Sequence, residues 1–164
     1  MPEPAAAGGG AWRTIEELAA LVGAYCWIEQ RIFEVTGAWA TGHGPMDDDI
    51  AELRVWAAAT SRRHGTLAGR WAERLPARAG VEAASLVTAP SGPAGVAEAF
   101  GELGATKELA AGAAALVETV LPWVGGVYGS HLAVAIPVSE ASVMEVLVEG
   151  RREASAEIRG GRTL

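Results

Sequence analysis

Apolar residues recur at steps of three and four along much of the chain, which is the period of an α-helix with one buried face. The clearest case is the segment from about 14 to 40, where Thr14 and Glu17 have the spacing of a capping box at a helix start. The apolar stripe of this segment consists of Ile15, Leu18, Leu21, Val22, Tyr25, Ile28, Ile32, Phe33 and Val35. The pattern therefore predicts a long first helix.

Three more long helices are predicted downstream. The second runs from about 46 to 75 and is opened by three consecutive aspartates, whose charges suit a helix N-terminus. The third, from about 106 to 135, is almost wholly Ala, Gly, Leu and Val, and Pro122 is expected to kink it. The fourth runs from about 139 to 159. Between the second and third helices the chain is rich in Pro and Gly, with a short helix expected at 95–103.

This order of elements predicts an all-α fold, because strand signals are weak throughout. Two helical hairpins with short turns are joined by a connector of roughly 30 residues, and such an arrangement is that of the ferritin-like four-helix bundle. We therefore expect two antiparallel hairpins with a long crossover connector, folded as one domain over residues 12–159. Residues 1–11 are expected to form a disordered tail and residues 160–164 a frayed one.

Composition narrows the possible functions. Half of the 164 residues are hydrophobic, which is enough for one sizeable core. The formal net charge is −7 and the basic residues form no long patch, which argues against a nucleic-acid partner. Cys26 is the only cysteine and so forms no internal disulfide. The chain also lacks a basic N-terminal region before an apolar stretch, and we expect a reducing, cytoplasmic location.

The segment 109–137 is the one stretch whose composition resembles a membrane span, since it carries a single carboxylate, Glu118. Pro122, several glycines and the lack of a flanking basic cluster argue against insertion. A helix that is apolar on all sides is also typical of the central helix of a bundle. We therefore expect no membrane partner.

Four polar residues are expected in apolar surroundings at the middle of the bundle, namely Glu29, His64, Glu118 and Glu153. Counting residues from the two predicted turns puts Glu29 about one helical turn from the level of His64. The same count puts Glu118 level with Glu153. Carboxylates and imidazoles that project inward from facing helices are the usual chemistry of such bundles. The pattern therefore predicts a polar site at this level.

Several segments carry a family resemblance. They are 25–39 (YCWIEQRIFEVTGAW), 61–64 (SRRH), 71–76 (WAERLP), 121–122 (LP) and 128–132 (YGSHL). Together they resemble a group of ferritin-like proteins of actinobacterial type over most of residues 12–158. By kinship of fold the chain is similar to di-iron carboxylate enzymes, including a tRNA-hydroxylase-like branch. Their metal ligands are one Glu from each of two helices and a Glu-x-x-His from each of the other two.

The resemblance implies that Glu29, His64, Glu118 and Glu153 hold iron or manganese. The ligand set is incomplete, because Ser61 stands three residues before His64 where the family pattern has a Glu. No histidine follows three residues after Glu153. The alternative is therefore a chain that binds no metal.

Purely structural roles remain open for the same residues. Glu29 could instead form an ion pair with Arg62 or Arg63 inside the bundle. Glu118 could face water, and Glu153 could belong to a solvated helix end. His131 lies outside the predicted level and is a candidate partner of Tyr128.

Two functions follow. The first is an enzyme that acts on an organic small molecule inside the bundle, either as a di-metal oxygenase or oxidase or by acid–base chemistry of Glu29 and His64. The interior pocket is expected beside the glycine-rich bend 122–129. Its predicted wall consists of Tyr25, Trp56, Trp123 and Tyr128. The second function is a metal-free binding or assembly module that serves a partner enzyme, with a homodimer as a further alternative.

Overall fold

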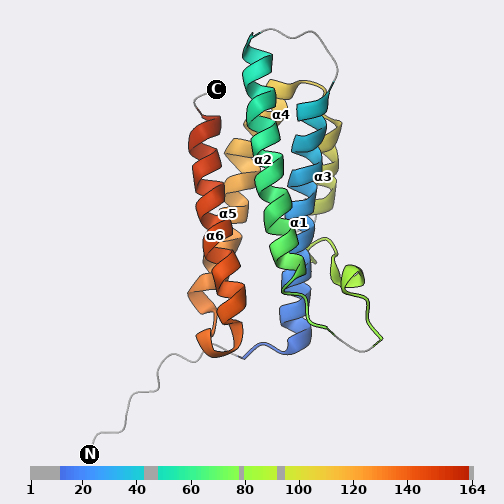
Figure 1. The fold of residues 1–164 in the computed structure, drawn as a ribbon, viewed down its shortest axis with the longest axis vertical. Helices are drawn as coiled ribbons and strands as arrows, with labels where there is room; N and C mark the ends of the chain where they lie inside the picture. The colour runs from blue at the N-terminus through green and yellow to red at the C-terminus, as the bar shows by residue number, and fades with distance from the viewer. Residues whose placement is uncertain (1–11, 43–47, 78–79, 92–94, 163–164) are drawn as a thin grey trace, which may run out of the picture.

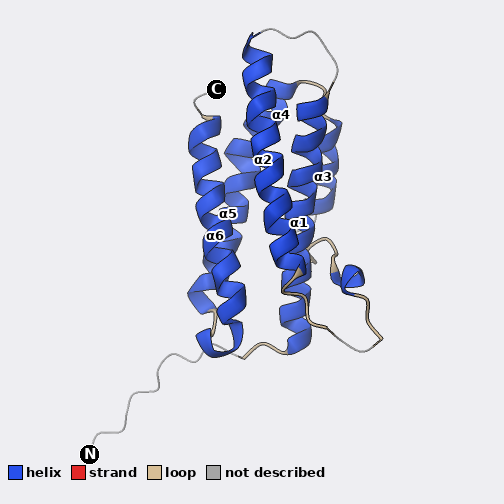
Figure 2. Cartoon of the chain, viewed as in Figure 1, coloured by secondary structure: helices blue, strands red, loops and turns tan. Residues whose placement is uncertain are grey.

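The computed structural model describes residues 12–42, 48–77, 80–91 and 95–162, and these ranges are all-helical, without a strand. The elements are α1 (Ile15–Thr41), α2 (Asp48–Ala72), the 3₁₀ helix η1 (Ala83–Leu86), α3 (Val96–Ala105), α4 (Leu109–Ala115), the π-helical turn η2 (Leu116–Val120), α5 (Leu121–Val134) and α6 (Pro137–Gly161). The prediction of an all-α chain is confirmed, and Figure 2 shows helices joined only by loops.

The long helices lie side by side, as Figure 1 shows. Helix α2 runs back along α1, and α6 runs back along α5, so each neighbouring pair is antiparallel. The chain leaves α2 at the bottom of the view, passes η1, climbs through α3 beside α1, and enters α4 at the top. Contacts of α2 with α4 and α6 join the two pairs. All long helices therefore share one core.

The helix ends have local causes. The Thr14 side chain accepts from the Glu17 N–H, and the Glu17 carboxylate accepts from the Thr14 N–H, so the predicted capping box is present. Helix α6 begins at Pro137 and ends at Gly161, so it extends about two residues beyond each end of the predicted range 139–159. Pro137 was expected only to stop the preceding helix, but proline is also favoured in the first turn of a helix. The predicted tail 1–11 and the turn around residues 43–47 lie outside the described residues.

The stretch Leu109–Val134 is one helical rod with a local change of hydrogen bonding. Pro122 has no N–H for the carbonyl of Glu118. At this point the rod forms a π-helical turn, in which the Leu121 N–H donates to the Leu116 carbonyl. Among the described residues this rod alone is long and apolar enough, by length and composition, to cross a membrane. A third of its most apolar window is buried in the structure, and core helices pass the same test.

The connector packs directly on α1 at Gly23. A Cβ atom at this position would lie 1.9 Å from the Leu86 carbonyl oxygen, so only glycine allows the approach. The contact fixes η1 against α1 and places Pro90 and Ser91 near Tyr25, where they line a common pocket. The connector is thus part of the fold.

We predict that Gly23→Ala lowers the free energy of unfolding by about 1–3 kcal/mol, the usual cost of overpacking. Gly69→Ala in α2 is the matched control, because a Cβ there meets nothing within 4 Å. It should leave stability unchanged or raise it by about 0.5–1 kcal/mol through its helix propensity. Urea denaturation measures both. Equal stabilities of the two variants would contradict direct packing of the connector on α1.

Candidate functional site

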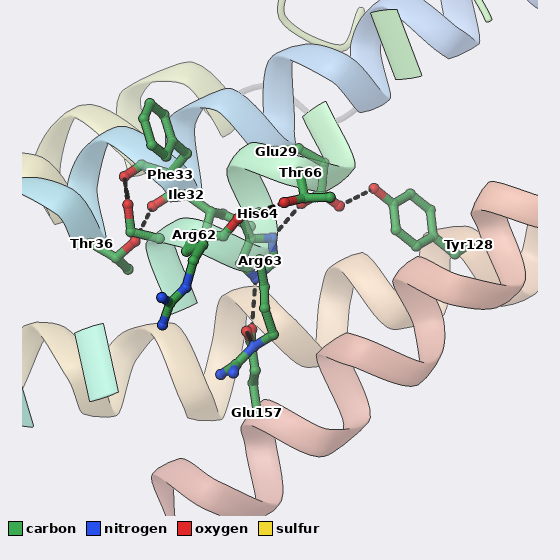
Figure 3. Close-up of polar contacts among 11 residues, drawn as sticks. Glu29, Ile32, Phe33, Thr36, Arg62, Arg63, His64, Thr66, Tyr128 and Glu157 are labelled. Atoms are coloured by element: carbon green, nitrogen blue, oxygen red, sulfur yellow. Dashed lines mark hydrogen bonds and ion pairs between the residues drawn. The ribbon is translucent and has the colours of Figure 1, made fainter. Parts of the chain in front are cut away.

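A chain of five polar side chains crosses the core and connects α1, α2, α5 and α6. Figure 3 shows Tyr128, Glu29, His64, Glu157 and Arg63 in contact one after another. Tyr128 Oη donates to Glu29 Oε1 at 2.5 Å, and the other Glu29 oxygen bonds His64 Nδ1. On the far side of the imidazole, His64 Nε2 lies 2.7 Å from Glu157 Oε2. Arg63 Nε donates to Glu157 Oε1 at 2.6 Å. We call these five residues the central chain.

The central chain is closed to solvent except at Arg63. The Glu29 and Glu157 side chains are fully buried and the His64 side chain is 1% exposed, whereas 39% of the Arg63 side chain is exposed. Charges so deep in a protein persist only when they are paired and hydrogen-bonded. Here each carboxylate oxygen and both ring nitrogens have a partner.

The charges of the central chain follow from its partners. Burial alone would lower the pKa of His64, but the carboxylates of Glu29 and Glu157 raise this pKa to about 10. At neutral pH the imidazole is therefore an imidazolium that donates from both nitrogens. Burial, with the nearby Glu29 carboxylate, raises the pKa of Tyr128 well above its usual value, so the phenol keeps its proton. Two cations and two anions leave the central chain without net charge.

The residues of the central chain do not fit a di-metal site. Glu29 and Glu157 contact opposite nitrogens of one imidazole, so their oxygens do not converge on a common point. Within the described ranges, no group of three or more His, Cys, Asp or Glu side chains is arranged to hold a metal ion. Ser61, where the family pattern has a ligand, donates to the Phe33 carbonyl of α1 at 2.9 Å. The donor atoms are thus engaged with one another.

The expected convergence of Glu118 and Glu153 with Glu29 and His64 is wrong. The Glu118 side chain is 57% exposed and pairs with Arg162 at 3.1 Å. The Glu153 side chain is 23% exposed and pairs with its neighbour Arg152. The α6 carboxylate that meets His64 is Glu157, one turn beyond Glu153. Counting from the turn predicts that Glu118 lies level with Glu153, but Glu118 pairs with Arg162, which directly follows the end of the same helix α6. The count also does not show which face of the helix a residue occupies.

A second polar chain lies toward the start of α1. Tyr25 Oη is 3.0 Å from His131 Nδ1, and His131 Nε2 is 2.6 Å from Glu140 Oε2. Arg13 Nη1 donates to both Glu140 oxygens, at 2.9 and 3.1 Å. We call these four residues the pocket chain. Both ring nitrogens of His131 are thus engaged, by Tyr25 and Glu140. The predicted pairing of His131 with Tyr128 is therefore wrong.

Protonation of the pocket chain differs from that of the central chain. Burial lowers the pKa of His131, so its imidazole is neutral at neutral pH. Burial alone would raise the pKa of Glu140, but hydrogen bonds from His131 and Arg13 hold it below its usual value. Since the Glu140 carboxylate only accepts, His131 Nε2 carries the proton and Nδ1 accepts from Tyr25. Burial raises the pKa of Tyr25 to about 12, so this phenol also keeps its proton.

The two chains meet at an aromatic cluster. The rings of Tyr25 and Tyr128 contact edge to face with centroids 5.1 Å apart, and Trp71 lies 5.1 and 5.9 Å from them. Tyr128 packs against Gly150 of α6, where a Cβ would lie 2.7 Å from the ring. Gly150 therefore gives Tyr128 the space that it occupies beside Glu29.

Two pockets open beside the pocket chain, between α1 and α5. One has a volume of about 570 Å³ and is lined by Arg13, Tyr25, Trp123 and His131 among others. Its neighbour of about 430 Å³ shares Tyr25 and Trp123 and is also lined by Pro90 and Ser91 of the connector. Of the four predicted pocket residues, Tyr25 and Trp123 thus line these pockets. Trp56 and Tyr128 are instead buried in the core.

The sequence holds a signal for the missed residues. The buried face of α6 follows steps of three and four through Glu140, Val143, Leu147, Gly150, Ala154 and Glu157. Extending the apolar stripe one step at either end therefore lands on a glutamate. The buried face of α5 leads in the same way through Leu121, Val124 and Tyr128 to His131.

Comparisons with protein-family models, with curated proteins and with solved structures found no match. The resemblance to ferritin-like proteins therefore remains a prediction.

The two histidines should give opposite pH dependences of stability. The pKa of folded His64, about 10, lies above its ordinary 6.5. Its stabilising contribution is therefore complete below about pH 6.5 and is lost as the pH rises toward 10. His131 has a lowered pKa, so its contribution is lost as the pH falls. In urea denaturation across a pH series, His64→Gln should flatten the alkaline loss of stability. His131→Gln should reduce the acidic loss and leave the alkaline one.

Replacing one carboxylate at a time should show that the central chain contributes more to stability than the exposed Glu118–Arg162 pair. We expect Glu29→Gln to lower the free energy of unfolding by about 3–5 kcal/mol, because it leaves the His64 cation without its full partner set. Glu118→Gln should cost less than about 1 kcal/mol, since exposed ion pairs contribute little. Thermal or urea denaturation measures both. Similar losses in the two variants would argue that Glu118 belongs to the core.

Proposed function

We propose that the chain is a ferritin-like four-helix bundle that works without a metal and carries out acid–base chemistry on an organic molecule bound between α1 and α5. The observation that carries the proposal is the pocket chain, in which Tyr25, His131 and Arg13 line the pocket wall. Glu140 bonds His131 from behind and is itself paired with Arg13. The short, long and short connections of the four long helices support the ferritin-like assignment. Glu29 and His64, expected to be catalytic, instead serve as structural charges in this proposal.

The pocket chain can move a proton in two coupled steps. A substrate O–H or N–H donates to Tyr25 Oη, and as Tyr25 takes this proton its own proton passes to His131 Nδ1. The new imidazolium lies between Tyr25 and the Glu140 carboxylate, whose charge stabilises it. Return of the proton by the reverse path makes Tyr25 the acid. His131 is suited to this role because it is neutral at neutral pH, whereas His64 is already charged.

A lowered catalytic pKa is not required, since Tyr25 only relays the proton. The high pKa of Tyr25, about 12, disfavours a standing phenolate and keeps the relay in its resting form. Glu140 keeps the imidazole in one tautomer, which is the role of a carboxylate behind a catalytic histidine.

The protonation states of the histidines test the proposal directly. The chain has three histidines, so a proton–nitrogen correlation spectrum of the imidazoles is simple to assign with His64→Gln and His131→Gln. At neutral pH we expect His131 as the neutral Nε2–H tautomer and His64 as the doubly protonated form. Tyr25→Phe should shift the His131 Nδ1 resonance and leave His64 unchanged.

An imidazolium His131 at neutral pH would overturn the acid–base proposal and leave the pocket as a binding site only. Addition of Mn²⁺ to the same sample tests the metal-free part, because this ion broadens resonances of nearby nuclei. Uniform, weak broadening is expected. Selective loss of the His64 resonances, absent in Glu29→Gln, would restore the di-metal prediction.

A further inference from the structure

The two pockets beside the pocket chain form one elongated binding region. They share four lining residues, Leu21, Tyr25, Trp123 and Val127. Arg13 and His131 occur only in the larger pocket, whereas Ala24 and Ile28 occur only in the smaller one. The region therefore has a polar end and an apolar end, with the Trp123 and Tyr25 side chains between them. Volumes of about 570 and 430 Å³ are those of sites for small organic molecules.

Hydrogen-bond accounting defines what the polar end can recognise. The single proton of Tyr25 is directed to His131 Nδ1, so Tyr25 Oη offers the pocket only lone pairs. Both nitrogens of His131 are engaged, and both oxygens of Glu140 accept from Arg13. A ligand group that meets Tyr25 must therefore be a donor.

The four residues of the pocket chain carry no net charge, so the polar end of the pocket does not select a ligand by its net charge. Glu140 and Arg13 neutralise each other, and His131 and Tyr25 are uncharged at neutral pH. A ligand carboxylate has no proton to donate to Tyr25 Oη, and the Glu140 carboxylate behind Arg13 would repel its charge. A hydroxyl donates to Tyr25, and its own oxygen can accept from the outer N–H groups of Arg13, which lines the same pocket.

We infer that the pocket between α1 and α5 takes an uncharged, largely apolar alcohol or phenol, whose hydroxyl donates to Tyr25 Oη and whose body lies along Leu21, Trp123 and Val127. This inference rests on the proposed function, because the hydroxyl is the group whose proton the pocket chain would accept. Aromatic compounds suit the site best, since the Trp123 ring offers a face or an edge for stacking.

Three probes of nearly equal shape test the inference. They are 2-naphthol, 2-methoxynaphthalene, which lacks the donor, and 2-naphthoate, which carries a negative charge. Isothermal titration calorimetry should give 2-naphthol an affinity at least about tenfold above those of the other two, because a buried acceptor left unpaired weakens binding. Tyr25→Phe should remove this preference, because it deletes the acceptor that 2-naphthol uses and that 2-methoxynaphthalene leaves unpaired.

Gly126→Leu locates the binding. Gly126 lines the larger pocket, and a Cβ there meets nothing within 4 Å, so leucine should fill the pocket without disturbing the fold. It should abolish binding of all three probes. Gly69→Leu, on the other pair of helices, is the control and should leave affinities unchanged.

Tighter binding of 2-naphthoate, equal binding of 2-naphthol and 2-methoxynaphthalene, or no binding of any probe would overturn the inference. These outcomes are independent of the test of the proposed function, which reads the His131 tautomer without any probe. A neutral His131 with the wrong order of probes would refute only the ligand class. An imidazolium His131 with the expected order would refute the acid–base role, and the preference for a hydroxyl would then rest on the calorimetry alone.

Discussion

The arrangement of the helices depends on one protonated imidazole between two carboxylates. His64 comes from α2, Glu29 from α1 and Glu157 from α6, so a single ring joins three helices by two charge-assisted hydrogen bonds. Tyr128 adds α5 through the free oxygen of Glu29. Each of these groups would be costly to bury alone, so an arrangement that separated the four helices differently would leave an uncompensated buried charge.

This constraint explains why the two polar chains differ in chemical character. The central chain is saturated, since its donors and acceptors are all engaged and its imidazole cannot take another proton. The pocket chain has a neutral imidazole and lies against a pocket. Tyr25 and Tyr128 contact each other at the boundary. The charged imidazole at the centre thus maintains the fold, and the neutral imidazole of the pocket chain keeps the capacity to take a proton.

The sequence was informative about elements and much less about the site. Periodicity located the long helices, and the capping box at Thr14 was confirmed. Glu29 and His64 were predicted to lie about one helical turn apart in level, because both belong to one hairpin, and in the structure they are in direct contact. Glu118 was misplaced, because counting from a turn does not show which face of a helix a residue occupies, and the Glu118 side chain is exposed beside Arg162. Glu157 was overlooked because it lies near a predicted helix end, although it continues the buried stripe of α6.

Helix α6 carries a buried glutamate at each end of its inner face, Glu140 and Glu157, about 25 Å apart at 1.5 Å per residue. Each glutamate has its own cation, Arg13 at one end and the Arg63 and His64 pair at the other. The rotation of α6 about its axis is therefore fixed at two points, because each glutamate must face its own partner. A single inserted or deleted residue between them would turn one end by about 100° relative to the other. The spacing between these two glutamates must therefore remain fixed for both to reach their partners.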